Sequence, residues 1–186
     1  MSREKDALRK RIRALQHEQL PTQEAYHAAS RHLMGLLERH PRFLAAGTVA
    51  LFWSLPDEPD THGFLEHHWR EKRLLLPVVT GETTMELRPY EGTENLQKGA
   101  FGILEPTGTV FDDFADIPLI VVPGVAFDRR GFRMGRGRGY YDRFLSQLPP
   151  FDGRKGTFRL GICFPFQLAD QLPVDTWDLP VDEVLC

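Results

Sequence analysis

The sequence predicts an α/β fold in which helices cover both faces of a mostly parallel sheet, a three-layer arrangement of the Rossmann-like kind. Segments with apolar residues at helical spacing alternate along the chain with short apolar runs. These runs are continuous rather than alternating, which is typical of strands buried on both faces. The 186 residues are 41% hydrophobic, enough for one full core. We therefore expect a single domain over residues 1–186.

Two amphipathic helices are expected at the start of the chain. Apolar residues recur at helical spacing before Pro21, which ends the first helix. Thr22 is placed to cap a second helix, which stops before Pro41. The inward-facing positions are Leu8, Ile12 and Leu15 in the first helix and Ala25, Ala29, Leu33, Leu36 and Leu37 in the second.

The next segments alternate between strand and helix. Thr48–Trp53 is a short apolar run and predicts a buried strand. Thr61 is expected to cap a third helix that extends to Trp69. Leu74–Val79 predicts another buried strand, and Thr84–Tyr90 alternates as a half-exposed strand does.

The second half of the chain repeats this alternation. Ile117–Val122 predicts a strand, and Tyr140–Leu148 predicts a helix. Thr157–Phe164 is expected to form a late strand and Val181–Leu185 the last one. Ligands of open α/β sheets bind beyond the carboxyl ends of strands. We therefore expect a site where three loops meet, namely residues 54–60, residues 123–139 and the segment after Phe164.

The loop after the strand at 117–122 is the most informative segment. Gly135, Gly137 and Gly139 alternate with Arg136 and Arg138. Glycines let backbone N–H groups converge on an anion. The loop is neither a Walker A sequence nor a dinucleotide fingerprint. It predicts a nucleotide-phosphate site, with a tight turn bearing solvated arginines as the alternative.

The segment around this loop resembles a family signature. Residues 123–128 read Pro-Gly-x-Ala-Phe-Asp, and residues 131–142 read Gly-x-Arg-x-Gly-x-Gly-x-Gly-Tyr-Tyr-Asp. This string resembles the signature of the 5-formyltetrahydrofolate cyclo-ligase family. The resemblance extends to residues 5–9, 52–58, 72–77, 101–106 and 172–182. The chain departs from the pattern at Arg138, where many relatives have glycine, and in ending at Cys186, soon after the last acidic pair.

The resemblance implies an activity: an ATP- and Mg²⁺-dependent ligase that closes 5-formyltetrahydrofolate to 5,10-methenyltetrahydrofolate and releases ADP and phosphate. It also implies an architecture similar to that of sugar-phosphate isomerases and CoA transferases. The partners would then be ATP and 5-formyltetrahydrofolate, and the folate could carry a polyglutamyl tail.

The resemblance also implies residue roles. We expect Arg136 and Arg138 to be catalytic, because they can stabilise charge on the transferred phosphoryl group. Asp142 is expected to bind Mg²⁺, with Asp178 as a second ligand. The ATP-binding set is Lys5, Arg9, Arg133, Met134, Gly135, Arg136, Gly137, Arg138, Gly139, Tyr140 and Tyr141. The folate-binding set is Trp53, Glu58, Arg136, Gly137, Arg138, Gly139 and Tyr140.

Composition limits the other classes of function. The net charge of −3 argues against general nucleic-acid binding, and no apolar run is long enough to span a membrane. Cys163 and Cys186 are too few for a disulfide framework, so we expect a cytoplasmic protein. We also expect it to be a monomer. The seven histidines show no metal-ligand spacing and are interpreted as solvated helix residues.

Two alternatives to the ligase remain at this stage. The Arg-Gly stretch and the basic start of the chain could bind RNA, although such stretches normally lie in polar low-complexity sequence. A sugar-phosphate isomerase or acyl-transfer enzyme could share the architecture without needing a nucleotide.

Overall fold

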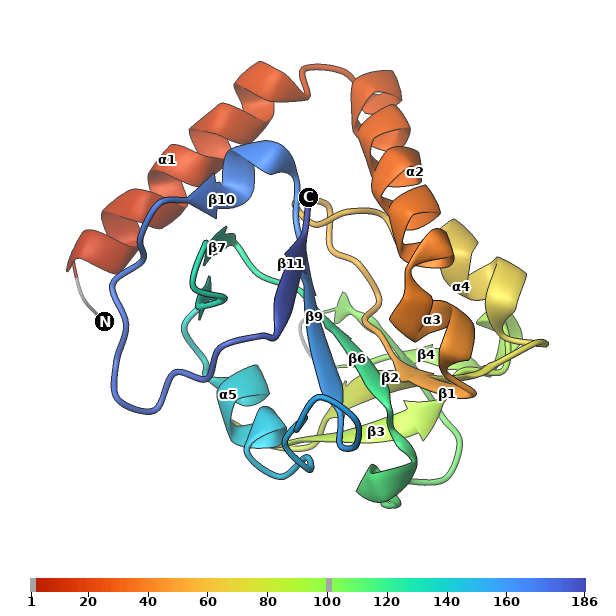
Figure 1. Ribbon diagram of the computed structural model, residues 1–186. Helices are drawn as coiled ribbons and strands as arrows, with labels where there is room; N and C mark the ends of the chain where they lie inside the picture. The colour runs from red at the N-terminus through yellow and green to blue at the C-terminus, as the bar shows by residue number, and fades with distance from the viewer. Residues whose placement is uncertain (1–2, 100–101) are drawn as a thin grey trace.

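The computed structural model describes residues 3–99 and 102–186. Within these residues, six strands form the main sheet in the order β11-β9-β6-β1-β2-β3 (Figure 1). Neighbouring strands run parallel, except that β3 is antiparallel to β2. The bounds are Thr48–Ala50 (β1), Arg73–Val79 (β2), Met85–Pro89 (β3), Leu119–Val122 (β6), Phe158–Ile162 (β9) and Glu183–Leu185 (β11). The predicted fold class, mixed α/β with a mostly parallel sheet, is confirmed.

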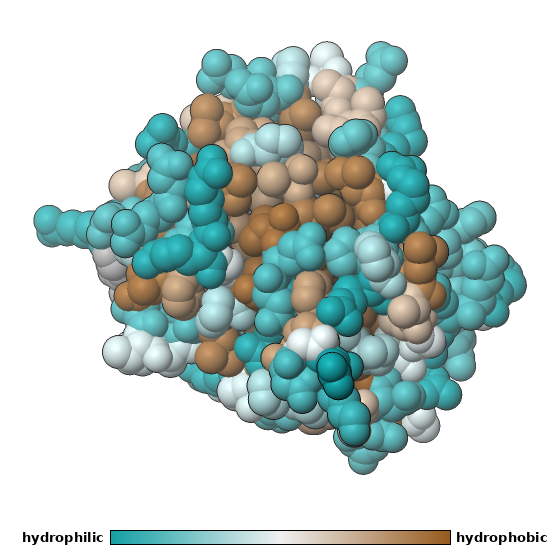
Figure 2. All heavy atoms as spheres, viewed as in Figure 1, coloured by the Kyte–Doolittle hydropathy of each residue, from teal (hydrophilic) through white to brown (hydrophobic). Residues whose placement is uncertain are grey.

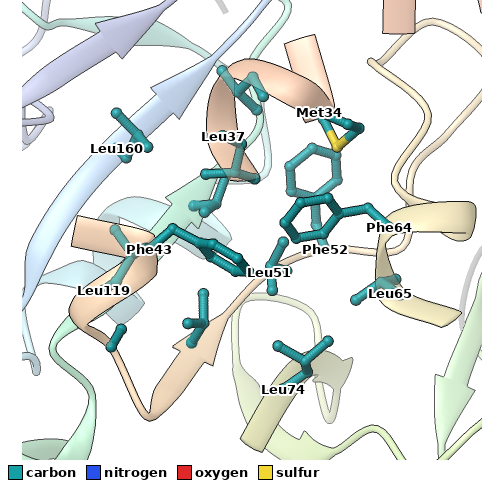
Figure 3. Packing of buried hydrophobic residues seen from close by; sticks show 14 of the residues in the cluster. Met34, Leu37, Phe43, Leu51, Phe52, Phe64, Leu65, Leu74, Leu119 and Leu160 are labelled. Carbon is teal, nitrogen blue, oxygen red and sulfur yellow. The ribbon is translucent and has the colours of Figure 1, made fainter. Parts of the chain in front are cut away.

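Helices lie on both faces of this sheet. On one face, Figure 3 shows side chains from α2, α3 and α4 packed against residues of the sheet, including Leu119 and Leu160. On the other face, Phe144 and Leu145 of α5 pack against sheet residues that include Ile120. The helices are α1 (Arg3–Gln19), α2 (Gln23–Arg39), α3 (Pro41–Ala45), α4 (His62–His68) and α5 (Tyr140–Leu145). The continuous apolar strands are buried because both faces are covered.

The first helix covers a second, smaller sheet. This sheet has the order β10-β7-β8, from Leu168–Ala169, Ala126–Asp128 and Arg133–Met134. Ile12 of α1 packs there against Val125 and Met134. In Figure 1, α1 accordingly lies beside β10 and the nearby C-terminal segment rather than over the main sheet. In the same view, Figure 2 shows apolar residues gathered where α1 and α2 diverge, on an otherwise hydrophilic surface.

Several local details differ from the sequence-based expectations. Three features were not predicted: the short helix α3, the small sheet, and the hairpin of β4 (Leu96–Lys98) and β5 (Leu104–Pro106). The strand predicted over 48–53 is assigned only to 48–50, although Leu51 N still donates to Leu75 O at 2.9 Å. The helix predicted over 140–148 ends at Leu145. These differences concern short or irregular segments, which have weak periodicity.

The two predicted caps behave differently. Thr22 caps α2 as expected, since its hydroxyl accepts from Ala25 N at 3.1 Å. Thr61 precedes α4, but its hydroxyl makes no cap and instead donates to Phe52 O at 2.7 Å. The threonine thus ties the start of α4 to the end of the first strand.

No helix in the described part of the chain is long and apolar enough to cross a membrane. Of the segment 101–106 that resembles the family, Phe101 lies outside the described residues.

Candidate functional site

A pocket of about 810 Å³ lies beyond the carboxyl ends of β1, β2 and β6. The strand order places β2 on one side of β1 and β6 on the other, so the pocket lies at a topological switch point of the sheet, where the order of the strands reverses. All three predicted loops contribute to the lining, and so does α1. Every residue that the sequence analysis assigned to a site lines this one pocket. Their separate roles remain predictions.

The glycine loop has the backbone expected of an anion cradle at two positions. Gly137 has a φ of 98° and Gly139 a φ of 70°, values that residues with a Cβ atom rarely adopt. Gly139 also precedes the first turn of α5. Gly135 shows no positive φ, but a Cβ there would lie 3.2 Å from Arg133 Nη1. Gly135 therefore serves close packing rather than backbone conformation.

Arg133 is buried at the base of the loop. Its side chain is 4% exposed, and Nη2 lies 2.8 Å from Oδ1 of Asp142. The guanidinium carbon lies 5.4 Å from the centre of the Tyr141 ring. Both Arg133 Nε and the Tyr141 hydroxyl are buried, and neither has a hydrogen-bond partner among the described residues. Buried donors are normally satisfied, so we expect these two to serve a bound ligand.

Arg136 connects the glycine loop with the loop after β1. Its Nη2 forms an ion pair with Asp57 and a second one with Glu58 Oε1 at 3.4 Å. The bond from Asp57 raises the pKa of Arg136 above its ordinary value, although burial acts in the opposite sense. Burial also raises the pKa of Glu58, while the Leu55 amide and Arg136 oppose this shift. Ion pairs therefore connect the two loops across the pocket.

The first helix and the C-terminal segment meet at the edge of the pocket. Lys5 Nζ lies 2.7 Å from Asp175 Oδ2 and 3.1 Å from Asp178 Oδ2. Arg9 donates from Nε and Nη2 to Gly135 O at 3.1 and 3.0 Å. Arg9 thus holds the glycine loop through Gly135, while the ammonium group of Lys5 lies at the edge of the pocket.

Aromatic side chains form the remaining wall. Trp53 is half-buried, and its ring centre lies 4.2 Å from that of His62. Tyr140 donates from its hydroxyl to Gly81 O at 3.1 Å. Trp177 also lines the pocket and is 69% exposed. A planar ligand could lie against these rings.

Sequence reasoning missed several residues of the site. Asp57, Asp175 and Trp177 line the pocket or pair with its cations, yet none was assigned a role. Glu105 was also left without a role; it is 4% exposed, lines the pocket and accepts from Val79 N at 3.1 Å. The available signal was composition: a tryptophan between acidic residues near a predicted site is unusual in a surface segment.

Asp128 was quoted in the family string but given no role. It is fully buried, and burial alone would raise its pKa. Hydrogen bonds from the Leu172 amide, the Arg130 side chain and nearby amides lower it instead. The ionised carboxylate therefore fixes the hairpin that leads into the glycine loop.

Comparison with known proteins identifies the family. A family profile described as the 5-formyltetrahydrofolate cyclo-ligase family matches residues 1–186. The chain belongs to the 5-formyltetrahydrofolate cyclo-ligase family. It is 34% identical over 183 residues to a protein of Escherichia coli K12 named 5-formyltetrahydrofolate cyclo-ligase, covering 96% of this chain and 95% of that one.

Two solved structures have a similar fold. The structure of Aquifex aeolicus 5,10-methenyltetrahydrofolate synthetase matches with a TM-score of 0.80 and 34% identity, covering 97% of this chain and 88% of that one. A Mycoplasma pneumoniae synthetase of that name matches in fold with a TM-score of 0.73 and 24% identity, covering 98% of each chain. The family and enzyme class expected from the sequence, a cyclo-ligase, are thus confirmed.

Proposed function

We propose that the protein closes 5-formyltetrahydrofolate to 5,10-methenyltetrahydrofolate in a reaction that consumes ATP, with Mg²⁺ as cofactor. The observation that carries this proposal is the position of Arg136. It belongs to the glycine loop, which suits phosphates, and it pairs with the carboxylates of Asp57 and Glu58 beside Trp53. A nucleotide and a pterin could therefore lie in contact within one pocket, as phosphoryl transfer between them requires.

The chemistry explains why a nucleotide is needed. The oxygen of the formamide is a poor leaving group, so the carbonyl does not cyclise readily. The formyl oxygen attacks the γ-phosphorus and the bond to ADP breaks. The neighbouring folate nitrogen then attacks the formyl carbon, loses its proton, and phosphate departs with the oxygen. These steps need positioning and charge stabilisation more than covalent help from the protein.

The phosphate side of the pocket supplies that stabilisation. We assign Arg136 and Arg138 to the transferred phosphoryl group, because guanidinium forks match its equatorial oxygens. Arg133 Nε and the Tyr141 hydroxyl add two buried donors that have no hydrogen-bond partner in the described structure. Lys5 places a further charge at the rim. Arg9 contributes by holding Gly135, which is a positioning role.

The folate side offers one flat wall and one carboxylate. Trp53 presents a half-buried ring to the pocket, which suits stacking on a pterin. Glu58 already accepts from the Leu55 amide through Oε2 at 2.9 Å. Its other oxygen, which is 3.4 Å from Arg136, is the one we assign to the amino edge of the pterin.

The acidic residues of the pocket fit Mg²⁺. Asp142 and Asp178 both line it, and Leu179 N donates to Asp142 Oδ1 at 3.4 Å, so the two segments adjoin. Within residues 3–99 and 102–186, the polar contacts of these carboxylates use Oδ1 of Asp142 and Oδ2 of Asp178, which leaves each a second oxygen. One or two carboxylates together with phosphate oxygens are the usual ligands of this ion. Bound there, Mg²⁺ would neutralise charge on the phosphates.

We infer a cytoplasmic, monomeric enzyme with one domain. It acts on folates with or without a polyglutamyl tail and needs neither nucleic acid nor membrane. The isomerase and RNA-binding alternatives gain no support from the site. An isomerase would not need a nucleotide cradle beside an aromatic wall, and an RNA-binding arginine would not be paired with two carboxylates.

The test is direct observation of the product. Purified protein is mixed with 5-formyltetrahydrofolate, Mg²⁺ and ATP, and the absorbance of the methenyl product is followed together with released ADP. We expect equal amounts of the two products and no reaction without ATP. Well-folded protein that released no methenyl product under these conditions would refute the proposed reaction.

A further inference from the structure

A second cluster of chemically active side chains lies outside the pocket, at the ends of α2 and α4. Glu38 is the penultimate residue of α2, and His67 and His68 end α4. One ligand atom from each lies within 4.8 Å of the others, the one group of this kind among residues 3–99 and 102–186. None of the three lines the catalytic pocket. These histidines were predicted to be solvated, which is wrong for His68, because it is 5% exposed.

His68 is held in a fixed orientation by its neighbours. Its ring centre lies 5.1 Å from that of Phe43 and 4.5 Å from that of Phe64. In this orientation Nε2 lies 3.3 Å from Glu38 Oε1. Nδ1 is buried and has no hydrogen-bond partner in the described part of the chain, although Glu71 Oε2 is 3.7 Å away. The imidazole is thus set between two carboxylates, one at each nitrogen.

Each nitrogen of the His68 ring faces a carboxylate, Nε2 that of Glu38 and Nδ1 that of Glu71. A neutral imidazole carries one N–H and one lone pair, so it can donate to only one of the two carboxylates. The other carboxylate then faces a lone pair, which is unfavourable unless a cation lies between them.

We propose that Glu38, His67 and His68 bind a divalent transition-metal ion of the zinc type. Imidazole nitrogen and carboxylate oxygen are ligands that this class of ion accepts. His68 would bind through Nε2, beside Glu38, and donate its Nδ1–H to Glu71. Metal-bound histidines commonly donate their second nitrogen to a carboxylate in this way, which fixes the tautomer and strengthens the ligand. The site is independent of the proposed ligase reaction.

Such an ion would join two helices that belong to different parts of the chain. It would hold the end of α2 to the end of α4, both of which pack on the same face of the sheet. A ligand that binds only the folded state raises stability by mass action. His67 and Glu38 are exposed, so an ion has access from solvent.

The test is titration of the metal-free full-length protein with Zn²⁺ by calorimetry and by thermal unfolding. All proteins carry Cys186→Ser, because the exposed thiol is a competing ligand. Glu38→Gln and His67→Gln remove ligands at exposed positions where folding should be unaffected. His32→Gln removes an exposed histidine elsewhere on α2 and is the matched control.

We expect one Zn²⁺ per chain in the parent and in the control, and affinity at least tenfold weaker in each ligand variant. Zn²⁺ should raise the unfolding temperature of the parent and the control but not of the two variants. Equal affinity in parent and ligand variants, or binding without a one-to-one stoichiometry, would overturn the proposal. Catalytic turnover is not used as a readout, because the cluster lies outside the pocket.

Discussion

At the scale of single residues, Gly137 offers the clearest test of the glycine loop. Its φ of 98° disfavours a residue with a Cβ atom by about 1–2 kcal/mol. We expect Gly137→Val to lose most of its ATP affinity, because the branched side chain also prevents close approach of phosphate. Gly153 also has a φ of 98° and lies outside the pocket, so Gly153→Val should carry similar strain and bind ATP normally. Calorimetric titration with ATP distinguishes the two variants.

Asp142 combines a structural role with its proposed metal role. In Asp142→Asn, buried Arg133 loses its charged partner, so we expect a loss of about 2 kcal/mol in the free energy of unfolding. Turnover should fall much further than ATP affinity, with a changed dependence on Mg²⁺. Asp170→Asn is the control, since its side chain is fully exposed. Turnover of Asp142→Asn close to that of the control would place the metal elsewhere.

Glu58 should make stability depend on pH. Its raised pKa means that the folded state holds this proton more tightly than the unfolded chain does. The stability that protonation of Glu58 provides is fully present at a pH below its pKa in the unfolded chain. It is lost as the pH rises through its pKa in the folded protein. We therefore expect Glu58→Gln to gain stability relative to the parent as pH rises. Urea unfolding across mildly acidic to mildly alkaline buffers measures this difference, and a pH-independent difference would contradict the expected shift.

At this scale, structural features were predictable from the sequence only where their cause is local. The alternating glycines and arginines indicated a phosphate loop, and Gly137 and Gly139 have the backbone that this requires. The pairing of Arg136 with Asp57 joins residues 79 positions apart, and no local pattern contains it. The buried setting of His68 was missed for the same reason, since it depends on Phe43 from another helix.

At the scale of elements, the N-cap of α2 by Thr22 can be tested by mutation. Thr22→Ala should lower the free energy of unfolding by about 1 kcal/mol, because Ala25 N loses its acceptor. Thr22→Ser keeps the hydroxyl and should remain near the parent. Denaturant titration of the three proteins provides the comparison, and similar losses in both variants would point to the lost methyl group instead.

Elements with long periodic patterns were predicted well. The first two helices and the buried strands match because apolar spacing reflects which faces are covered. Thr61 shows the limit: its position before α4 was correct, but its hydroxyl bonds to Phe52 O, a choice made by tertiary contact. The strand β8 has only two residues, too few for any period to be read.

At the scale of the molecule, the pocket depends on contacts between distant ends of the chain. Lys5 pairs with Asp175 and Asp178, and we expect Lys5→Met to weaken ATP binding while costing under about 1 kcal/mol of stability, because the pair is partly exposed. Amide hydrogen exchange in residues 175–178 should become faster. Lys10→Met, at an exposed position on the same helix, should change neither property. Unchanged exchange in Lys5→Met would mean that the pair does not order the segment.

The same contacts bear on how the protein is made. During synthesis α1 is made long before its partners, because the carboxylates that pair with Lys5 lie 170 and 173 positions later. The strand β11, which closes the edge of the sheet against β9, comes later still. Most of the core could assemble during synthesis, whereas the pocket takes its final shape only after residues 175–185 have emerged. A nascent chain stalled before these residues would therefore be nearly folded but would lack a complete pocket.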